Sequence, residues 1–244
     1  CDQPDGLNIN DRCGSTYPER LQRTVVERKA DVGFAFDGDG DRCLIVDARG
    51  ELHDGDFVLA LAARHFARHS KLDPRVVVGT VMTTGGMEAT LARAGIQLVR
   101  TQVGDRYVWE EMDKRGAQFG GEPSGHVIFR EHATTGDGIL TALEVLAIAS
   151  AERRPLADLA AEIERWPQVL MNVRVARRTE WQDVRAFREE YERAKSEIEK
   201  GGGRINVRPS GTEPVLRILV EARAETVASS TAQRLAALAQ EVLA

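Results

Sequence analysis

The feature that most constrains this chain is an alternation of aspartate and glycine, Asp37-Gly38-Asp39-Gly40-Asp41-Arg42, directly after an apolar run. The run, residues 32–36 (VGFAF), predicts a buried strand, because its larger side chains alternate with Gly and Ala. Side chains two residues apart project to the same side of an extended chain, so the three carboxylates converge beyond the strand's carboxyl end. Converging carboxylates repel one another unless a cation neutralises them, and hard oxygen ligands favour Mg²⁺. The sequence therefore predicts a Mg²⁺ site at Asp37, Asp39 and Asp41.

The acidic loop could also be an EF-hand loop, the active site of a phosphatase or an exposed turn. An EF-hand loop that starts at Asp37 would require Gly at its sixth position and Glu at its twelfth, where the chain has Arg42 and Ala48. The EF-hand is therefore excluded. A phosphatase with an aspartate nucleophile would use Asp37 for attack and Asp39 as the acid/base, and it stays a minor alternative. An exposed acidic turn does not explain three aspartates in strict alternation with glycine.

Composition narrows the class of protein. A chain of 244 residues with 42% hydrophobic residues can bury one large core or two smaller ones. Its net charge is −5, and no basic block is interleaved with aromatic residues, so no nucleic-acid partner is expected. No apolar run approaches the roughly 18 residues of a membrane span. The three widely spaced cysteines favour reduced thiols and a cytoplasmic location, and the start at Cys1 suggests a fragment of a longer chain.

Strand and helix patterns alternate along the first two thirds of the chain. Strands are expected at 32–36, 75–80 and 96–101, and helices at 53–71, at 87–94, after residues 103–107 up to residue 115, and at 139–151. In the last of these helices, Ile139, Leu143, Leu146 and Ala147 share a face. The alternation predicts an α/β sandwich with a mixed, mostly parallel sheet, whose strand ends at loops 37–42, 83–86 and 104–106 would border a ligand.

Composition changes near Trp166-Pro167, where a second unit is expected to begin. The strands predicted there cover 169–175, 204–208 and 215–222, and the helices cover 180–200 and 225–243. This order predicts a smaller α+β domain with its own core. A domain boundary near residue 165 follows.

A second chemical stretch, Gly121-Glu122-Pro123-Ser124-Gly125-His126, lies in the first unit. Its glycines let the backbone approach a ligand closely, while Glu122 and Ser124, two residues apart, can hydrogen-bond adjacent hydroxyls of a sugar. Taken alone, an ordinary Gly/Pro turn explains the stretch equally well. His126 is either a proton-transfer group or a structural histidine beside a strand.

A pair of hydroxyl residues, Ser15-Thr16, stands in a Gly-led loop. Ser15 could serve as a nucleophile. A helix N-cap at Thr16, shortly before Pro18, is the more ordinary explanation.

A third chemical stretch, Arg208-Pro209-Ser210-Gly211-Thr212-Glu213-Pro214, joins two predicted strands. Arg208, Ser210, Gly211 and Thr212 together offer a guanidinium group, two hydroxyls and backbone N–H groups to one tetrahedral anion. The stretch therefore predicts a phosphate-binding loop. Arg217 either adds a second cation or faces solvent.

Together, the acidic loop 37–42, the loop 121–126 and the loop 208–214 resemble the magnesium, sugar-binding and phosphate-binding loops of the α-D-phosphohexomutase superfamily. Within it, the branch of bacterial phosphoglucosamine mutases is the most similar. The stretches that carry this finer likeness are CGSTYPE (13–19), VGDRYV (103–108), TTGDG (134–138) and PQVLMNV (167–173). The resemblance covers essentially the whole chain.

The resemblance implies a domain organisation and a missing partner. Residues 1–53 would be a remnant of phosphohexomutase domain 2, residues 54–165 domain 3 and residues 166–244 domain 4. The phosphorylated serine loop of the family's first domain is absent from the sequence, so the chain would be a C-terminal half whose partner is the N-terminal half of the same protein. Pro123 departs from the family's sugar loop, which leaves the choice of sugar open.

The resemblance also implies an activity, the interconversion of glucosamine 6-phosphate and glucosamine 1-phosphate through a phosphoserine and a bisphosphate. Mg²⁺ on the three aspartates would neutralise the phosphoserine, Glu122 and Ser124 would hold the sugar, and the loop 208–214 would grip the non-reacting phosphate. The candidates for the catalytic acid/base role are Arg42, Asp105, Arg106 and His126. Without the serine loop this chain alone is expected to be inactive. A non-catalytic fragment that binds metal and sugar phosphate, phosphomannomutase or phosphoglucomutase specificity, and assembly as a homodimer stay open.

Overall fold

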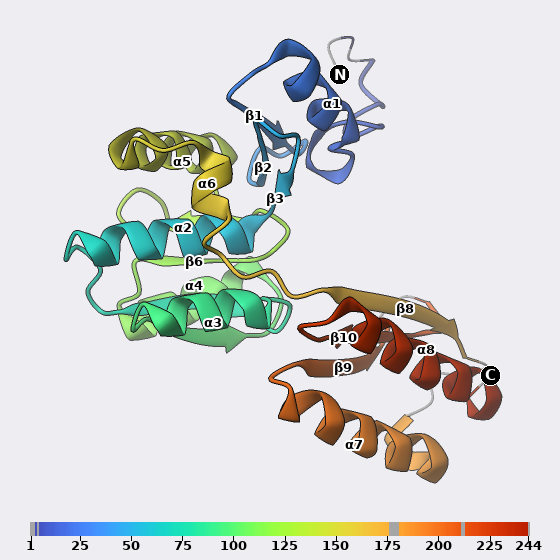
Figure 1. The fold of residues 1–244 in the computed structure, drawn as a ribbon. Coiled ribbons are helices and arrows are strands. Elements are labelled where there is room, and N and C mark those ends of the chain that lie inside the picture. The colour runs from blue at the N-terminus through green and yellow to red at the C-terminus, as the bar shows by residue number, and fades with distance from the viewer. Residues whose placement is uncertain (1–2, 4, 176–180, 211–212, 244) are drawn as a thin grey trace. The chain divides into compact units, whose positions relative to one another are not determined.

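The computed structural model describes residues 3, 5–175, 181–210 and 213–243. The chain divides into two compact units, residues 1–83 with 87–164 and residues 84–86 with 165–244. Each unit is described by itself (Figure 1). None of the helices in these described ranges is long and apolar enough to cross a membrane.

The first unit contains a four-stranded mixed sheet with the strand order β5-β4-β6-β7. Its strands are β4 (Val76–Thr80), β5 (Gln97–Thr101), β6 (Phe119–Gly121) and β7 (Val127–Phe129). β4 pairs in parallel with both β5 and β6, and β7 returns antiparallel to β6. Every residue of β4 is buried, as expected of the continuous apolar run at a central position. The predicted mixed, mostly parallel sheet is confirmed.

Helices cover both faces of this sheet, as in an α/β sandwich. Val77 belongs to a core cluster shared with α2 (Gly55–Arg68), α3 (Gly85–Arg93), α5 (Gly138–Glu152) and α6 (Leu156–Ala160). Val76 and Val78 belong to a second cluster shared with α4 (Asp105–Arg115). Because neighbouring residues of a strand point to opposite faces, the two clusters lie on opposite sides of β4.

The acidic loop belongs to a separate sheet. β1 (Val32–Phe36), β2 (Cys43–Asp47) and β3 (Leu52–His53) form an antiparallel sheet in the order β1-β2-β3. Phe36 pairs with Cys43, so residues 37–42 connect the two arms of a hairpin. The expectation that this loop lies at the carboxyl edge of the mainly parallel sheet is therefore wrong. Strand alternation reveals a strand but not its partner, and here the partner is the next strand along the chain.

The helix α1 (Glu19–Arg28) packs beside this small sheet, and a short 3₁₀ turn, η1 (Gly14–Thr16), precedes it. α1 begins after Pro18 with no side-chain cap, and the Thr16 hydroxyl lies 3.4 Å from the Cys13 carbonyl oxygen. The N-cap prediction for Thr16 is therefore wrong. Thr16 is the last residue of the 3₁₀ turn, and Tyr17 and Pro18 separate it from the helix.

α5 buries a different face from the one its sequence suggested. Ile139, Leu143 and Leu146 are 63%, 58% and 42% exposed, while Ala142, Val145 and Ile148 pack into the core. The helix is apolar nearly all round, so periodicity alone does not identify the face that meets its neighbours.

The second unit is an antiparallel sheet with helices on one face. Its strands are β8 (Gln168–Arg174), β9 (Arg204–Pro209) and β10 (Val215–Glu221), in the order β8-β10-β9. One face of the sheet packs against α7 (Arg185–Lys200) and α8 (Glu225–Val242), and a 3₁₀ turn, η2 (Trp181–Asp183), precedes α7. The predicted α+β unit is confirmed. Its other face carries Asn172, Arg208 and Arg217 together with the exposed Leu170.

Candidate functional site

The acidic loop curls so that its first and last carboxylates meet. The Gly40 amide donates to the Asp37 carbonyl oxygen (3.2 Å), and the Arg42 amide lies 3.3 Å from Asp37 Oδ1. The Arg42 guanidinium also approaches the same carboxylate, with Nε 3.5 Å from Oδ2. The carboxyl groups of Asp37 and Asp41 lie close enough to raise the pKa of Asp41, whereas Asp39 is exposed. The structure therefore brings Asp37 and Asp41 together and leaves Asp39 at the tip of the loop.

Asp41 is placed where a cation would stabilise it. Burial first, then the adjacent carboxyl group of Asp37, raises the pKa of Asp41, and nearby His126 and Arg42 oppose this in part. Its Oδ1 atom is buried and has no hydrogen-bond partner in the described part of the chain. A carboxylate oxygen without a donor, beside a second carboxylate, is a ligand set that suits a hard divalent cation. These residues fit Mg²⁺.

The start of α5 holds the acidic loop in shape. The Gly138 amide donates to the Gly40 carbonyl oxygen at 2.8 Å. A Cβ at Gly138 would lie 2.6 Å from the Arg42 carbonyl oxygen, and one at Gly136 would lie 2.8 Å from the Asp41 carbonyl oxygen. Only glycine fits at such distances without moving the loop. The stretch TTGDG, which carried part of the resemblance, therefore has a positioning role that its residue types alone did not reveal.

The loop 121–126 is hydrogen-bonded through its backbone to the end of the acidic loop. Arg42 and His126 form an antiparallel bridge, and the Cys43 amide donates to the Gly125 carbonyl oxygen at 3.0 Å. Gly125 has a φ of 94°, and a Cβ there would lie 2.5 Å from the Cys43 carbonyl oxygen. Two of the three predicted loops are therefore neighbours within one unit.

His126 is buried at this junction. Its Nε2 accepts a hydrogen bond from the Gly136 amide at 3.2 Å and lies 3.7 Å from Asp41 Oδ2, which is too long for a hydrogen bond. Its Nδ1 is buried without a partner among the described residues. His126 therefore lies beside the acidic loop, within the electrostatic reach of Asp41.

Glu122 is held by a backbone amide at the start of α4. Its Oε1 accepts a hydrogen bond from the Gly104 amide at 2.8 Å, and Gly104, with a φ of 133°, is the N-cap residue of that helix. The Gly55 amide donates to the Pro123 carbonyl oxygen at 3.2 Å, and a Cβ at Gly55 would lie 2.0 Å from the Glu122 carbonyl oxygen. Ser124 is exposed at the tip. The stretch VGDRYV thus supplies the amide that orients Glu122.

The other two catalytic candidates, Asp105 and Arg106, make local contacts in the first turn of α4. Asp105 Oδ1 accepts from the Arg106 amide at 2.7 Å. The Arg106 side chain is 81% exposed and pairs with Glu110 at 2.7 Å. These contacts stabilise the helix and assign neither residue a chemical role.

A cavity of about 520 Å³ opens beside the acidic loop. Phe36, Asp37 and Gly38 line one part of it, and the N-terminal segment lines the rest with Gly6, Asn8, Ile9, Asn10, Asp11, Cys13 and Gly14. The N-terminal lining was not foreseen, because a run of turn residues carries no periodic signal.

The predicted phosphate loop lies in the second unit. Arg208 on β9 and Arg217 on β10 are directly opposite each other, and Asn172 on β8 is opposite Arg217. Like charges placed opposite each other across two strands are destabilising unless an anion lies between them. Because paired residues of adjacent strands point to the same side, Arg217 lies on the same face of the sheet as Arg208. Gly211 and Thr212 lie outside the described residues.

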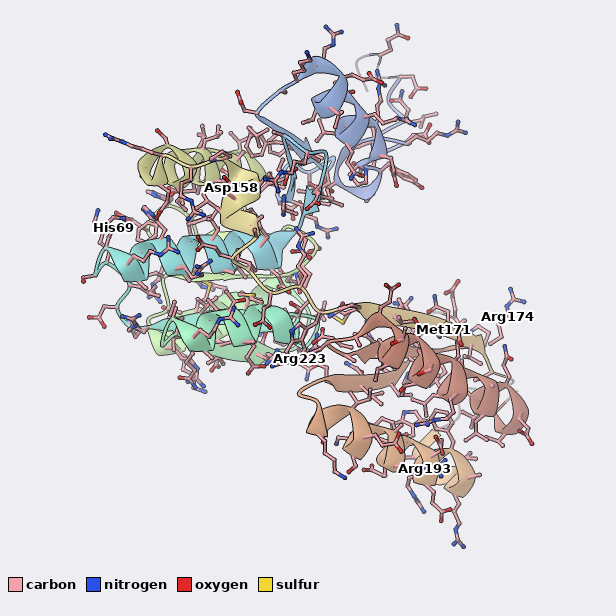
Figure 2. All side chains as sticks on the ribbon, viewed as in Figure 1. His69, Asp158, Met171, Arg174, Arg193 and Arg223 are labelled. Carbon is pink, nitrogen blue, oxygen red and sulfur yellow. The ribbon has the colours of Figure 1, made fainter. Side chains whose placement is uncertain are left out.

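Ser210 and Arg174 extend this polar face. Ser210 is buried, and its amide donates to the Val215 carbonyl oxygen at 2.7 Å. Arg174 is opposite Val215, near the end of β8 (Figure 2). Sequence reasoning missed Asn172 and Arg174, although the stretch PQVLMNV ended one residue before Arg174. Their strand pairing is what places them beside the predicted phosphate loop.

Comparisons with known proteins identify the family. The family model described as phosphoglucomutase/phosphomannomutase, alpha/beta/alpha domain III, matches residues 54–166. The model for the C-terminal domain of the same family matches residues 170–238. The chain belongs to the phosphohexomutase family.

Curated members of the phosphohexomutase family resemble this chain over nearly its whole length. Proteins named phosphoglucosamine mutase from Desulforudis audaxviator and Symbiobacterium thermophilum are 48% and 50% identical over 99% and 98% of the chain. In both cases the chain spans 53% of the relative's length. The chain therefore corresponds to about half of these phosphohexomutases.

A solved phosphohexomutase structure has the same fold. It is the Aspergillus fumigatus N-acetylphosphoglucosamine mutase in complex with GlcNAc-6P and magnesium, with a TM-score of 0.77 and 23% sequence identity. The match covers 96% of this chain and 57% of that one. At this identity the likeness supports the fold alone.

Proposed function

We propose that this chain is the C-terminal half of a phosphoglucosamine mutase, which interconverts glucosamine 6-phosphate and glucosamine 1-phosphate. The names of its 48–50% identical relatives support this assignment. We further propose a cytoplasmic location, in keeping with the free thiols of Cys13 and Cys43.

The observation that carries the proposal is the meeting of Asp37 and Asp41 beside an unpartnered carboxylate oxygen. These two residues, with Asp39 from the loop tip, would hold Mg²⁺. When bound there, Mg²⁺ neutralises negative charge on a phosphoryl group that reacts nearby. Gly138 and His126 fix the loop so that this geometry exists before any ligand arrives.

The sugar phosphate would be held by two sets of residues. Glu122, oriented by the Gly104 amide, and the exposed Ser124 would bind sugar hydroxyls. Arg208 and Arg217, opposite each other on their strands, would bind the non-reacting phosphate together with Ser210, Gly211 and Thr212. The Pro123 carbonyl oxygen accepts a hydrogen bond from the Gly55 amide, so Pro123 supports the backbone of the loop.

The partner that would complete the enzyme is the N-terminal half of the same protein. In the described part of the chain β1 is an edge strand, paired only with β2, and a groove of about 430 Å³ runs beside it. Apolar side chains line this groove, among them Leu21, Phe34 and Phe36. An edge strand beside an apolar groove is a surface on which a further strand can pair and pack. The phosphoserine would come from this missing half.

Binding of glucosamine 6-phosphate to the chain, measured by isothermal titration calorimetry with and without Mg²⁺, tests the proposal. We expect binding that weakens at least about tenfold in Arg208→Ala, because loss of a charge-assisted pair costs about 1.5–3 kcal/mol. Arg188→Ala, an exposed arginine of α7 that bonds a backbone carbonyl, is the matched control and should leave the affinity unchanged. Equal affinity of wild type and Arg208→Ala would reject the assigned phosphate site.

A further inference from the structure

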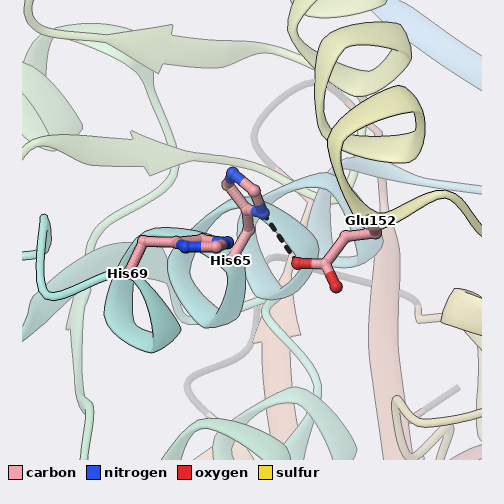
Figure 3. Close-up of side chains that lie close together, drawn as sticks. All are labelled: His65, His69 and Glu152. Carbon is pink, nitrogen blue, oxygen red and sulfur yellow. Dashed lines mark hydrogen bonds and ion pairs between the residues drawn. The ribbon is translucent and has the colours of Figure 1, made fainter.

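A group of metal-ligand side chains lies away from the acidic loop, where α2 and α5 end. His65 lies in the last turn of α2, His69 is the residue that caps the C-terminal end of α2, and Glu152 lies in the last turn of α5 (Figure 3). Ligand atoms of the three side chains all lie within 4.8 Å of one another. From Gly55, which supports the sugar loop, the helix rises about 15 Å to His65. The group is therefore distinct from the proposed sugar-phosphate site.

The spacing of the two histidines suits chelation. Residues four apart lie one above the other on a helix face, so His65 and His69 can present their imidazoles to one ion. Their ring centroids are 4.6 Å apart. Two imidazoles and one carboxylate form the ligand set of three-ligand zinc sites, which leave one position of the tetrahedron open.

Glu152 completes the set from the second helix. Its Oε1 is 2.7 Å from His65 Nδ1, and both side chains are largely buried, whereas His69 is exposed. The hydrogen bond from His65, and the positive charges nearby, lower the pKa of Glu152, so the group is a carboxylate. Ligands about 2.1 Å from zinc lie about 3.4 Å apart, so binding needs only a small opening of the His65–Glu152 contact.

The charges around the three side chains partly favour and partly oppose a bound cation. The C-terminal ends of two helices meet here, and the partial negative charge at each favours a cation. Arg68 opposes a cation, because its guanidinium lies 3.1 Å from Glu152 Oε2. Glu162 pairs with Arg68, Arg64 and Arg154 and thereby draws positive charge away from Glu152. Arg68 is therefore the main competitor of a metal at Glu152.

We infer that His65, His69 and Glu152 form a binding site for a borderline transition-metal ion such as Zn²⁺, which links the ends of α2 and α5. Imidazole nitrogen selects such ions over Mg²⁺. Because the imidazoles bind metal only when unprotonated, occupancy falls as the solution is acidified.

Calorimetric titration of Zn²⁺ into the whole chain, with Mg²⁺ in excess to occupy the acidic loop, tests this site. We expect one Zn²⁺ per chain and at least about tenfold weaker binding in His69→Ala, since loss of even an outer partner of a metal site costs that much. His69 is exposed, so this variant should fold. His132→Ala is the matched control, because His132 pairs with Glu144 at 3.2 Å without a second histidine one turn away.

Arg68→Met distinguishes a metal site from a purely structural contact. Removal of the competing guanidinium should tighten Zn²⁺ binding several-fold. The same substitution removes the ion pair between Arg68 of α2 and Glu152 of α5. Co²⁺ titrated in place of Zn²⁺ should give an absorption band of a tetrahedral complex that is absent in His69→Ala. Zn²⁺ affinity that is the same in wild type, His69→Ala and Arg68→Met would overturn the inference.

Discussion

At the scale of single residues, the candidate metal site contains a carboxyl group that the fold holds at a cost in stability. Asp41 has a buried oxygen without a partner and a like charge beside it at Asp37. Its pKa is raised, so folding favours its protonated form. The stability that Asp41 contributes is therefore present at low pH and is lost as the pH rises from its unfolded pKa through its folded pKa.

Asp41→Asn should therefore stabilise the metal-free chain at neutral pH, by no more than about 1 kcal/mol for this partly exposed group. Near pH 4 the gain should vanish. Mg²⁺ should raise the unfolding temperature of the wild type but not of the variant, because the variant has lost a ligand. Thermal unfolding with and without Mg²⁺ measures both effects, with Asp31→Asn as the exposed control. A metal-free variant less stable than the wild type at pH 7 would contradict this assignment.

Most of the charged candidate residues were predicted from the sequence, but the backbone groups that contact them were not. Asp37, Glu122 and Arg208 were identified because alternation and turn chemistry are local patterns. The Gly104 amide on Glu122 and the Gly138 amide on the acidic loop join residues far apart in the chain. No local pattern encodes such a pairing, so these contacts required the structure.

At the scale of elements, close packing between backbones decides the geometry of the site. Helix α5 begins against the acidic loop, and this approach is available only to glycine. The strands and helices themselves were largely predicted, since their periodicity is local. The hairpin of β1 and β2 and the buried face of α5 were not, because both depend on which element lies opposite.

Gly138→Ala should displace residues 40–42 and destabilise the chain by about 1–3 kcal/mol, the usual cost of overpacking. Mg²⁺ affinity should fall with it, because the loop that carries the ligands moves. Denaturant unfolding and Mg²⁺ titration would show both losses. In Gly201→Ala the nearest atom to the new Cβ is 3.4 Å away, so this control should lose little stability and no affinity. A Gly138→Ala chain with unchanged Mg²⁺ affinity would show that the acidic loop does not depend on α5.

At the scale of the whole molecule, the chain contains the three loops 37–42, 121–126 and 208–214, to which we assign metal, sugar and phosphate binding. It spans 53% of the relatives named phosphoglucosamine mutase. The α/β and α+β units were predicted from the order of their elements, because each forms its own core. The unpaired edge of β1 and the groove beside it were not predicted from the sequence and were found only in the structure.

The most direct test of the account is a mutase assay on this chain with and without a serine-bearing half. The part of the 50% identical Symbiobacterium thermophilum relative that precedes the matched region would be joined upstream of Cys1. We expect the joined protein to interconvert glucosamine 6-phosphate and glucosamine 1-phosphate with Mg²⁺, and to lose this activity in Asp41→Asn. The chain alone should bind the sugar phosphate without turnover. Release of inorganic phosphate by the chain alone, abolished in Asp37→Asn, would contradict the account and favour an aspartate-nucleophile phosphatase.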